Sequence, residues 1–485
     1  MTKRRVLLSA ALLLGLASLN HSFVPSLSAR SCFRLASDEI EFDEDDVDVQ
    51  SYAAYKNRLA ALARTASRDP TAVAKANDVF DQMFQAYLVS EDAQMWPQTD
   101  IYNLLIRTHA CSRDKQAIEN AEMILGRMGQ EGVPQPDAGS YNEIMKAYAM
   151  RRDLTSTKRV LDQAPMKTIE LYNTLLMAYG IEGRVDESHQ LFEQLLEEGP
   201  EPNAKTWVQV MRTHATRDDG VDEIKKLMGR MANGFRKEGK EDWKPNIGAY
   251  NALLMALSRN TGNAKEAEAI LYALLDQYKA GDESMKPTEE TFYHVIQSYR
   301  GEVDVGVSFK IENFVSMMHA VDPPRRNVRT YKAAMVAVSR THDPKKACRS
   351  NRFLDNIREL TTPDIHAYKS LLNACAFTSG DDEDKLDAFT IAVDTLKEMR
   401  KQDLVDSDCY SLFLKACARL LPSTRKRDAV VEATFQDCCQ AGLVSKRVLK
   451  DFTQAASEEL TLRILGGFIE DGVQPDKEWS KNVVA

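Results

Sequence analysis

The chain has 485 residues, of which 44% are hydrophobic and 28% are charged, and its formal net charge is −9. The hydrophobic share is enough for a continuous core, and the charged share suits exposed helix faces. The acidic balance counts against tight, nonspecific binding of nucleic acid, although it is compatible with a positive face opposite an acidic one.

The first 37 residues have the composition of a targeting leader. Three bases at positions 3–5 precede an apolar run over 6–17 that is too short to span a membrane. The motif Ser22-Phe23-Val24-Pro25 follows, and no acid occurs before residue 38. This arrangement resembles the two-part leader of proteins that enter complex plastids, with Phe23 as the aromatic at the signal cleavage site. We therefore predict a signal plus transit-type leader over 1–37 and a plastid location, with a secretory or a mitochondrial leader as the alternatives.

An acidic segment, residues 38–50, follows the leader. Eight of the eleven residues 38–48 are acids and none is basic. Such a block is typical of a solvated, disordered spacer. Residues 1–48 carry five bases and eight acids, a net −3, so the rest of the chain carries −6 of the total −9.

The segment 51–98 has the pattern of one irregular helical hairpin. Helices are expected over 52–64 and 72–88, with Asp69-Pro70 between them and Trp96-Pro97 at the end. We predict that this hairpin caps a longer array, because a terminal hairpin needs one wetter face.

The most regular unit of the chain is the 35-residue segment 169–203. Two apolar faces at helical spacing indicate two helices, and they are formed by Tyr172, Leu175, Leu176 and Tyr179 and by Leu191, Phe192, Leu195 and Leu196. Gly183 is expected to end the first helix, Gly199 suits the end of the second, and Pro202 prevents continuation. Two helices cannot enclose a core alone, so copies of this hairpin must stack.

Copies of the unit recur at spacings of 31 to 43 residues. Each begins its first helix with an aromatic residue, at Tyr102, Tyr141, Tyr172, Trp207, Tyr250, Phe292, Tyr331, Tyr368 and Tyr410. Most copies end in proline plus a small polar residue, as in Pro136-Asp137, Pro202-Asn203, Pro245-Asn246, Pro287-Thr288 and Pro363-Asp364. Pro165 is expected to shorten one second helix, and glycine-rich exposed loops are expected at 234–244 and 281–286.

The run Tyr172-Asn173-Thr174-Leu175-Leu176, the Gly183-Arg184 turn and the ending Gly199-x-x-Pro202-Asn203 resemble the pentatricopeptide repeat. The resemblance covers residues 99–446, is most specific at 99–203 and 247–256, and is loose after about residue 300. It implies an all-α fold, a right-handed α-solenoid of about ten helix-turn-helix repeats. The tetratricopeptide pattern is not visible, and HEAT-like arrays lack the Tyr-Asn and Pro-Asn punctuation.

The C-terminal segment 447–485 is expected to form capping helices, and no catalytic domain is expected after it. The sequence has no Walker loop, no Cys-x-x-Cys pair and no His-x-Glu with downstream cysteines, and its eight histidines lack ligand spacing. We therefore expect no enzyme activity, no metal and no cofactor. Cys375, Cys417 and Cys438-Cys439 are expected to be reduced core thiols.

The residue directly after the aromatic is asparagine in four copies: Asn103, Asn142, Asn173 and Asn251. Asparagine is a poor helix former, so its recurrence there indicates a cap or a binding role. The family resemblance implies that this residue reads an RNA base on the concave face, assisted by the residue after the terminal proline, here Asp137, Asn203, Asn246 and Asp364. The same resemblance implies pyrimidines for Asn103 with Asp137 and for Asn173 with Asn203. The alternative for the post-proline residues is a helix N-cap. Five copies depart from the asparagine pattern, with Val208, Tyr293, Lys332, Lys369 and Ser411.

An arginine recurs near the end of six first helices: Arg151, Arg217, Arg259, Arg300, Arg340 and Arg419. With Lys332 and Lys369, these residues could form a basic track for phosphates. The alternative is that arginine favours helix C-termini through the helix dipole.

Taken together, these features predict an organellar protein that binds single-stranded RNA and acts in RNA processing, stabilisation or translation without catalysis. A separate nuclease or other processing protein is a further expected partner, and no membrane anchor is expected in the mature chain. The alternative is a protein-interaction scaffold with little or no RNA binding.

Overall fold

The computed structural model describes residues 51–90, 92–130, 133–321, 328–467 and 477–483. The predicted leader and acidic spacer lie outside these residues. The described residues contain 22 α-helices, α3 to α24, with a few short 3₁₀ turns between them and no β-strand. They divide into two compact units, one ending at Thr216 and including Glu241–Trp243, the other holding Arg217–Lys240 and the residues from Lys244 onward.

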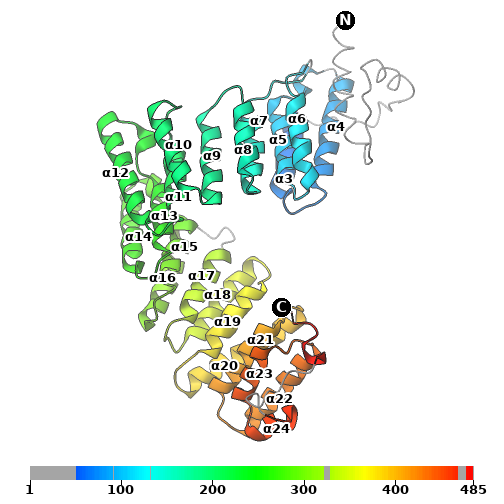
Figure 1. Ribbon diagram of the computed structural model, residues 1–485, viewed down its shortest axis with the longest axis vertical. Helices are drawn as coiled ribbons and strands as arrows, with labels where there is room; N and C mark the ends of the chain where they lie inside the picture. The colour runs from blue at the N-terminus through cyan, green and yellow to red at the C-terminus, as the bar shows by residue number, and fades with distance from the viewer. Residues whose placement is uncertain (1–50, 91, 131–132, 322–327, 468–476, 484–485) are drawn as a thin grey trace, which may run out of the picture. The chain divides into compact units, whose positions relative to one another are not determined.

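The first unit consists of helices that pair along the chain (Figure 1). They are α3 (Tyr52–Thr65), α4 (Ala72–Ser90), α5 (Thr99–Cys111), α6 (Lys115–Arg127), α7 (Ala138–Met150), α8 (Leu154–Gln163), α9 (Ile169–Glu182), α10 (Val185–Glu197) and α11 (Ala204–His214). The odd-numbered helices, which we call first helices, pack on one another in sequence. The even-numbered second helices each pack on the first helix of their own copy and on that of the next copy.

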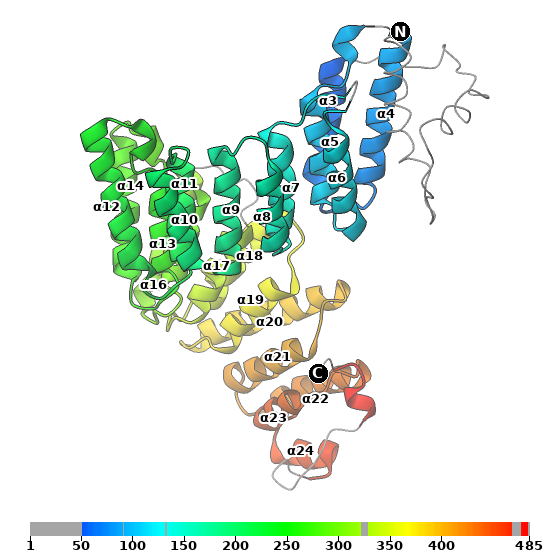
Figure 2. The ribbon, with the colours of Figure 1, turned by 45° about the horizontal axis from the view of Figure 1, so that its top comes forward.

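The second unit repeats this arrangement (Figure 2). It contains α12 (Gly220–Glu238), α13 (Ile247–Leu257), α14 (Ala264–Lys279), α15 (Glu289–Ser298), α16 (Val305–Val321), α17 (Val328–Ser339), α18 (Lys346–Leu360), α19 (Ile365–Ala376), α20 (Asp382–Lys401), α21 (Ser407–Leu420), α22 (Arg425–Gln440), α23 (Lys446–Ala455) and α24 (Glu458–Leu465). Here too the first helices from α13 to α23 pack one on the next. The predicted all-α fold of stacked helical hairpins is thus confirmed.

The predicted hairpin at 169–203 is present as α9 and α10. Gly183 ends α9 in the left-handed region, with φ of 69°, where an L side chain would be strained. Gly199 is required for a different reason, because a Cβ atom there would lie 2.8 Å from the Cα atom of Leu195. Gly183 therefore serves the turn within the copy, and Gly199 serves the turn that leads to the next copy.

Burial of the aromatic residues explains why first helices stack. Trp207, Phe292 and Tyr368 are 1%, 0% and 0% exposed, and the ring of Trp207 packs edge-on against Phe192 of the preceding copy. Each ring removes a large apolar area from water, on the order of 1.5–3 kcal/mol per side chain. A copy without its aromatic would pack less well on its neighbour and within its own core.

Two expectations about irregular segments have different outcomes. The second helix that precedes Pro165 is short, as predicted, and α8 ends at Gln163. The prediction of a loop that begins at Gly234 was wrong, because α12 continues through this buried residue to Glu238. The left-handed Gly239, with φ of 67°, ends the helix instead. Met231 and Gly234 are three residues apart and both are buried, which is the spacing of one helix face. The prediction treated Gly234 as a helix breaker and overlooked this spacing.

Three of the four cysteines expected in the core lie there, and Cys439 is only partly buried. Cys375, Cys417 and Cys438 are fully buried, and all cysteines in the described residues are free thiols. Burial raises the pKa of the Cys417 thiol to about 12, so the thiol stays protonated and unreactive.

Candidate nucleic-acid interface

The asparagine after the aromatic meets the first residue of the next copy in two places in the first unit. The side-chain amide of Asn103 donates to Asp137 Oδ1 at 3.1 Å, and that of Asn173 donates to Asn203 Oδ1 at 3.2 Å. These are the two pairs that the family resemblance implies. Each pair sets an amide beside a carboxylate or carbonyl oxygen, which are the groups that complement the edges of bases.

The acceptor of each pair also begins a helix. Asp137 Oδ1 accepts from the backbone N–H of Ser140 at 2.9 Å, and Asn203 Oδ1 accepts from that of Thr206 at 3.1 Å. The same N-cap bond is made by two further post-proline residues, Asn246 and Asp364. Burial opposes ionisation of Asp137, but the hydrogen bonds from Ser140 and Asn103 outweigh it and hold the pKa of its carboxyl below the usual value. Capping is therefore one role of each of these four residues.

Asn251 is more enclosed than the other asparagines. Only 3% of it is exposed, its amide donates to Thr288 Oγ1 at 3.3 Å and Glu290 Oε2 at 3.4 Å, and Thr291 donates to its Oδ1 at 2.7 Å. Every polar atom of this side chain is already bonded to protein. A base could reach Asn251 only after these hydrogen bonds open.

Asn142 and Asn173 lie in adjacent copies and differ in how their oxygens are used. Thr174 donates to Asn142 Oδ1 at 2.5 Å. Asn173 Oδ1 has no hydrogen-bond partner within the described part of the chain, although the residue is only 8% exposed. A buried acceptor without a donor costs about 1–3 kcal/mol, so a ligand N–H at this point would be favoured.

Lysine replaces asparagine in two copies of the second unit, and each lysine forms an ion pair across the copy boundary. Lys332 bonds to Asp364, and Lys369 bonds to Asp406 and Asp408. Burial opposes ionisation of Asp364, but hydrogen bonding from Lys332 outweighs it and lowers the pKa of the carboxyl. These lysines neutralise local carboxylates, so their charge adds little to a basic track.

The three other residues that stand in place of asparagine do not form such amide pairs either. Ser411 is buried and donates to Asp451. The guanidinium of Arg329 lies over the ring of Tyr293, 3.5 Å from its centroid. Val208 offers no polar group at all. No base-reading pair is therefore formed at these three positions.

The recurrent arginines connect neighbouring first helices. Arg151 Nη1 donates to Ala110 O at 2.8 Å and its Nη2 donates to Ser112 O at 2.7 Å. Arg300 donates to Arg259 O at 2.7 Å, and Arg340 donates to Arg300 O at 3.0 Å. The acceptors are carbonyls at or just beyond the C-terminal end of the preceding first helix, which lack partners within their own helix. We call this series the arginine ladder.

The other two arginines of the predicted track have different partners. Arg217 forms an ion pair with Asp219 at 3.1 Å, and the guanidinium of Arg419 lies 4.8 Å from the ring centroid of Phe377. The predicted role of the arginines in phosphate binding stays a prediction, and it must coexist with these interactions.

Two features of this surface were not predicted. The first is the ion pairing of Lys332 and Lys369, which the sequence spacing could have indicated. Lys332 precedes Asp364 by 32 residues and Lys369 precedes Asp406 by 37, close to the 34 residues between Asn103 and Asp137. The stacking of Arg329 on Tyr293 has no such signal, since these residues belong to different copies and share no motif.

Stacked helical hairpins of this kind define an α-helical repeat protein. Residues 170–200, which lie within the hairpin of α9 and α10, match the family model described as PPR repeat. The pentatricopeptide repeat-containing protein At3g14330 of Arabidopsis thaliana is 28% identical over 213 residues, which are 43% of this chain and 27% of that protein. The chloroplastic pentatricopeptide repeat-containing protein At3g57430 of the same plant is 26% identical over 146 residues, 30% of this chain and 16% of that protein. The chain is thus similar to pentatricopeptide repeat proteins, and it spans about a quarter or less of these two relatives.

Solved structures give a further comparison. The crystal structure of the pentatricopeptide repeat protein PPR10 from maize aligns with 92% of this chain and 57% of its own, at 18% identity and a TM-score of 0.38. The structure of PPR10 in complex with an 18-nt psaJ RNA element aligns with 88% of this chain and 75% of its own, at 16% identity and a TM-score of 0.34.

None of the described helices has both the length and the apolar character that crossing a membrane requires. The same residues contain no group of three or more potential metal-ligating side chains.

Proposed function

We propose that this chain binds single-stranded RNA along its first helices and acts, without catalysis, in RNA processing, stabilisation or translation in an organelle. The observation that carries the proposal is the pairing of Asn103 with Asp137 and of Asn173 with Asn203. Each pair gathers donors and acceptors at the boundary between two copies, and single-stranded RNA exposes the base edges that such groups recognise. The free Oδ1 of Asn173 adds an acceptor without a protein donor.

The mild acidity of the chain bears on how tightly RNA would bind. An acidic protein cannot rely on nonspecific attraction to phosphates, so a larger share of the affinity must come from interactions with bases. We expect weak dependence on salt and clear dependence on sequence.

The test is fluorescence anisotropy with the full chain and RNA selected from a random single-stranded pool. Asn173→Val should weaken binding of the selected RNA about tenfold, the order expected when one base is no longer hydrogen-bonded. Asn120→Val is the matched control, because Asn120 lies on the second helix α6 and is partly buried. Equal affinity of the wild type, Asn173→Val and Asn120→Val would remove the proposed role of the asparagine pairs.

A protein-interaction scaffold is the second candidate, and a specific observation favours it for the second unit. There the positions expected to read bases hold the ion pairs Lys332–Asp364 and Lys369–Asp406, or the buried Ser411. Crosslinking and immunoprecipitation of the tagged protein separates the two functions. Enriched transcripts support the RNA-binding proposal, whereas co-purified proteins without any enriched transcript support the scaffold.

The organelle is proposed as the plastid, with the mitochondrion as the alternative. Support comes from the composition of residues 1–37 and from the chloroplastic relative. Fusion of residues 1–48 to a fluorescent protein tests the address, and Phe23→Ala should abolish plastid import if Phe23 marks the signal cleavage site. A separate nuclease or processing protein is proposed as the catalytic partner and would appear in the same immunoprecipitate.

A further inference from the structure

Two histidines from neighbouring helices meet at a boundary between copies in the first unit. His189 lies on the second helix α10 and His214 at the end of the first helix α11, and these helices pack against each other (Figure 1). Nδ1 of His189 is 3.1 Å from Nε2 of His214, and the two rings are nearly perpendicular, at 86°. A neutral imidazole has one N–H, so one of these nitrogens donates and the other accepts with its lone pair.

A carboxylate determines which nitrogen of His189 carries the proton. Glu193 Oε1 lies 3.4 Å from His189 Nε2, one turn further along α10. This contact favours a proton on Nε2 and leaves Nδ1 with a lone pair that faces His214. Histidines that bind metals in proteins are held in the same way, with the second ring nitrogen donating to a carboxylate or a carbonyl.

The distance between the two facing nitrogens suits two ligands of one cation. Zinc–nitrogen bonds of about 2.0–2.1 Å place two ligand nitrogens about 2.8–3.0 Å apart at a right angle and about 3.3–3.4 Å apart at the tetrahedral angle. The observed 3.1 Å lies between these values. The side chains of His189 and Glu193 are each 36% exposed, so a hydrated cation can reach the pair, although His214 itself is 7% exposed.

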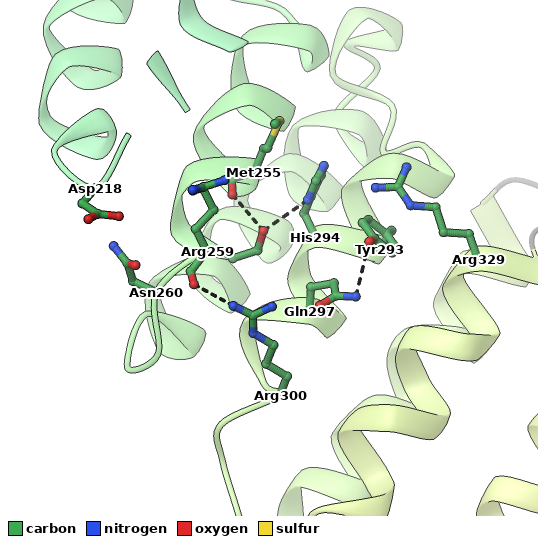
Figure 3. A pocket seen from close by; sticks show the side chains of 10 residues that line it. Asp218, Met255, Arg259, Asn260, Tyr293, His294, Gln297, Arg300 and Arg329 are labelled. Atoms are coloured by element: carbon green, nitrogen blue, oxygen red, sulfur yellow. Dashed lines mark hydrogen bonds between the residues drawn. The ribbon is translucent and has the colours of Figure 1, made fainter. Parts of the chain in front are cut away.

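Other histidines are bonded to amides or hydroxyls instead. His109 Nε2 faces Asn77 Oδ1 at 3.0 Å. His294, which lines a pocket in the second unit, faces Ser258 Oγ with its Nδ1 at 3.3 Å (Figure 3). Such partners position an imidazole but provide no second nitrogen ligand, so the pair on α10 and α11 differs from them in its chemistry.

We infer that His189 and His214 bind one divalent transition-metal cation, zinc or copper, with Glu193 orienting His189. Both metals favour imidazole ligands. The cation takes the place of the proton between the rings, and His214 then carries its proton on its other nitrogen. Water completes the coordination, because the pair supplies two ligands where a structural zinc site has four. The bound cation ties α10 to α11 across the boundary between two copies.

Sequence spacing does not reveal this site. The two histidines are 25 residues apart and lie on different helices, so no ligand motif links them. The expectation of a chain without metal rested on that spacing. The inference does not depend on RNA binding, since neither histidine belongs to the asparagine pairs.

The experiment titrates the full chain with zinc chloride by calorimetry, without RNA. We expect a zinc site in the wild type that His189→Asn lacks, because an amide does not replace the imidazole as a zinc ligand. Glu193→Gln should weaken zinc binding about tenfold, since it removes the carboxylate that orients His189. His366→Asn is the matched control, because His366 is an exposed histidine of α19, and this variant should bind zinc as the wild type does.

Hydrogen exchange separates a metal site from a histidine pair that serves packing alone. Zinc should increase the protection of α10 and α11 in the wild type and leave it unchanged in His189→Asn. A thermal melt without zinc reports whether His189→Asn folds, and Glu193→Gln carries the same comparison if it does not. The inference is overturned if the wild type and the folded variant bind zinc equally, or if zinc leaves the protection of both helices unchanged in the wild type.

Discussion

The arginine ladder has two interpretations, binding of phosphates and stabilisation of neighbouring first helices. Substitution of Arg151 distinguishes between them. Arg151 donates to Ala110 O at 2.8 Å and to Ser112 O at 2.7 Å, at the end of the preceding first helix. Arg151→Met keeps the aliphatic stem and removes both bonds. Hydrogen bonds from a charged donor contribute about 1.5–3 kcal/mol when buried, and Arg151 is exposed, so we expect a loss of about 1–2 kcal/mol in total.

Hydrogen exchange of the full chain is the assay, because an array of copies need not unfold in one step. Protection should fall at the C-terminal end of α5 and at the start of α6. Arg151→Lys should also lose protection, since an ammonium lacks the two-pronged geometry of guanidinium. Arg64→Met is the matched control, because Arg64 lies in the last turn of the first helix α3.

The result that would refute this reasoning is unchanged protection in Arg151→Met together with weaker RNA binding. In that case Arg151 would act on phosphate, and the slope of log affinity against log salt would fall by about 0.7 for each phosphate that the variant no longer neutralises. Arg151→Lys would then retain most of its RNA affinity, because the positive charge remains.

Three further predictions concern single positions. Burial, with a smaller contribution from the charge of Asp78, raises the pKa of Asp81 to about 6, so this carboxyl destabilises the fold progressively as pH rises from about 4 to about 6. Asp81→Asn should stabilise the fold by about 1 kcal/mol near pH 7, which raises the melting temperature, and should leave stability unchanged near pH 4, because the partly buried carboxyl is then protonated. Gly183→Ala should cost about 1 kcal/mol in a denaturant titration, since φ is 69° and no neighbouring atom would touch the new methyl. Lys332→Asn should replace the ion pair to Asp364 with an amide pair and extend the RNA footprint by one nucleotide.

Each of these predictions has a result that contradicts it. An equal gain in melting temperature at both pH values would show that Asp81→Asn acts through something other than ionisation. Gly229 lies inside α12 with no atom near an added Cβ, so Gly229→Ala should stabilise, and a loss there would undermine the backbone argument made for Gly183. An unchanged footprint in Lys332→Asn would mean that the second unit does not read bases.

Local pattern was enough to predict much of the fold. Apolar spacing around Tyr172 and Leu191 identified a hairpin, and Gly183 identified its turn, because these signals act within a few residues. Gly234 misled the prediction, since a glycine that is tolerated inside a helix looks the same in sequence as one that ends it.

The candidate site was less accessible to prediction. The pairs Asn103–Asp137 and Asn173–Asn203 could be anticipated because the family resemblance implies them. Whether a side chain is sealed, as Asn251 is, depends on Thr291 and Glu290 in the next copy, and no periodicity reports that. The stacking of Arg329 on Tyr293 is likewise a property of packing between copies.

The residues after the proline carry an unusual restriction. Asp137 and Asn203 start a helix with the same oxygen that faces the neighbouring asparagine. Any residue installed there to alter base preference must still be a good first residue of a helix, which leaves Asp, Asn, Ser, Thr and little else. If the chain distinguishes nucleotides at these positions, the set of residues available for doing so is limited to those that can begin an α-helix. Substitutions that change base selectivity would then also change the stability of the helix that follows.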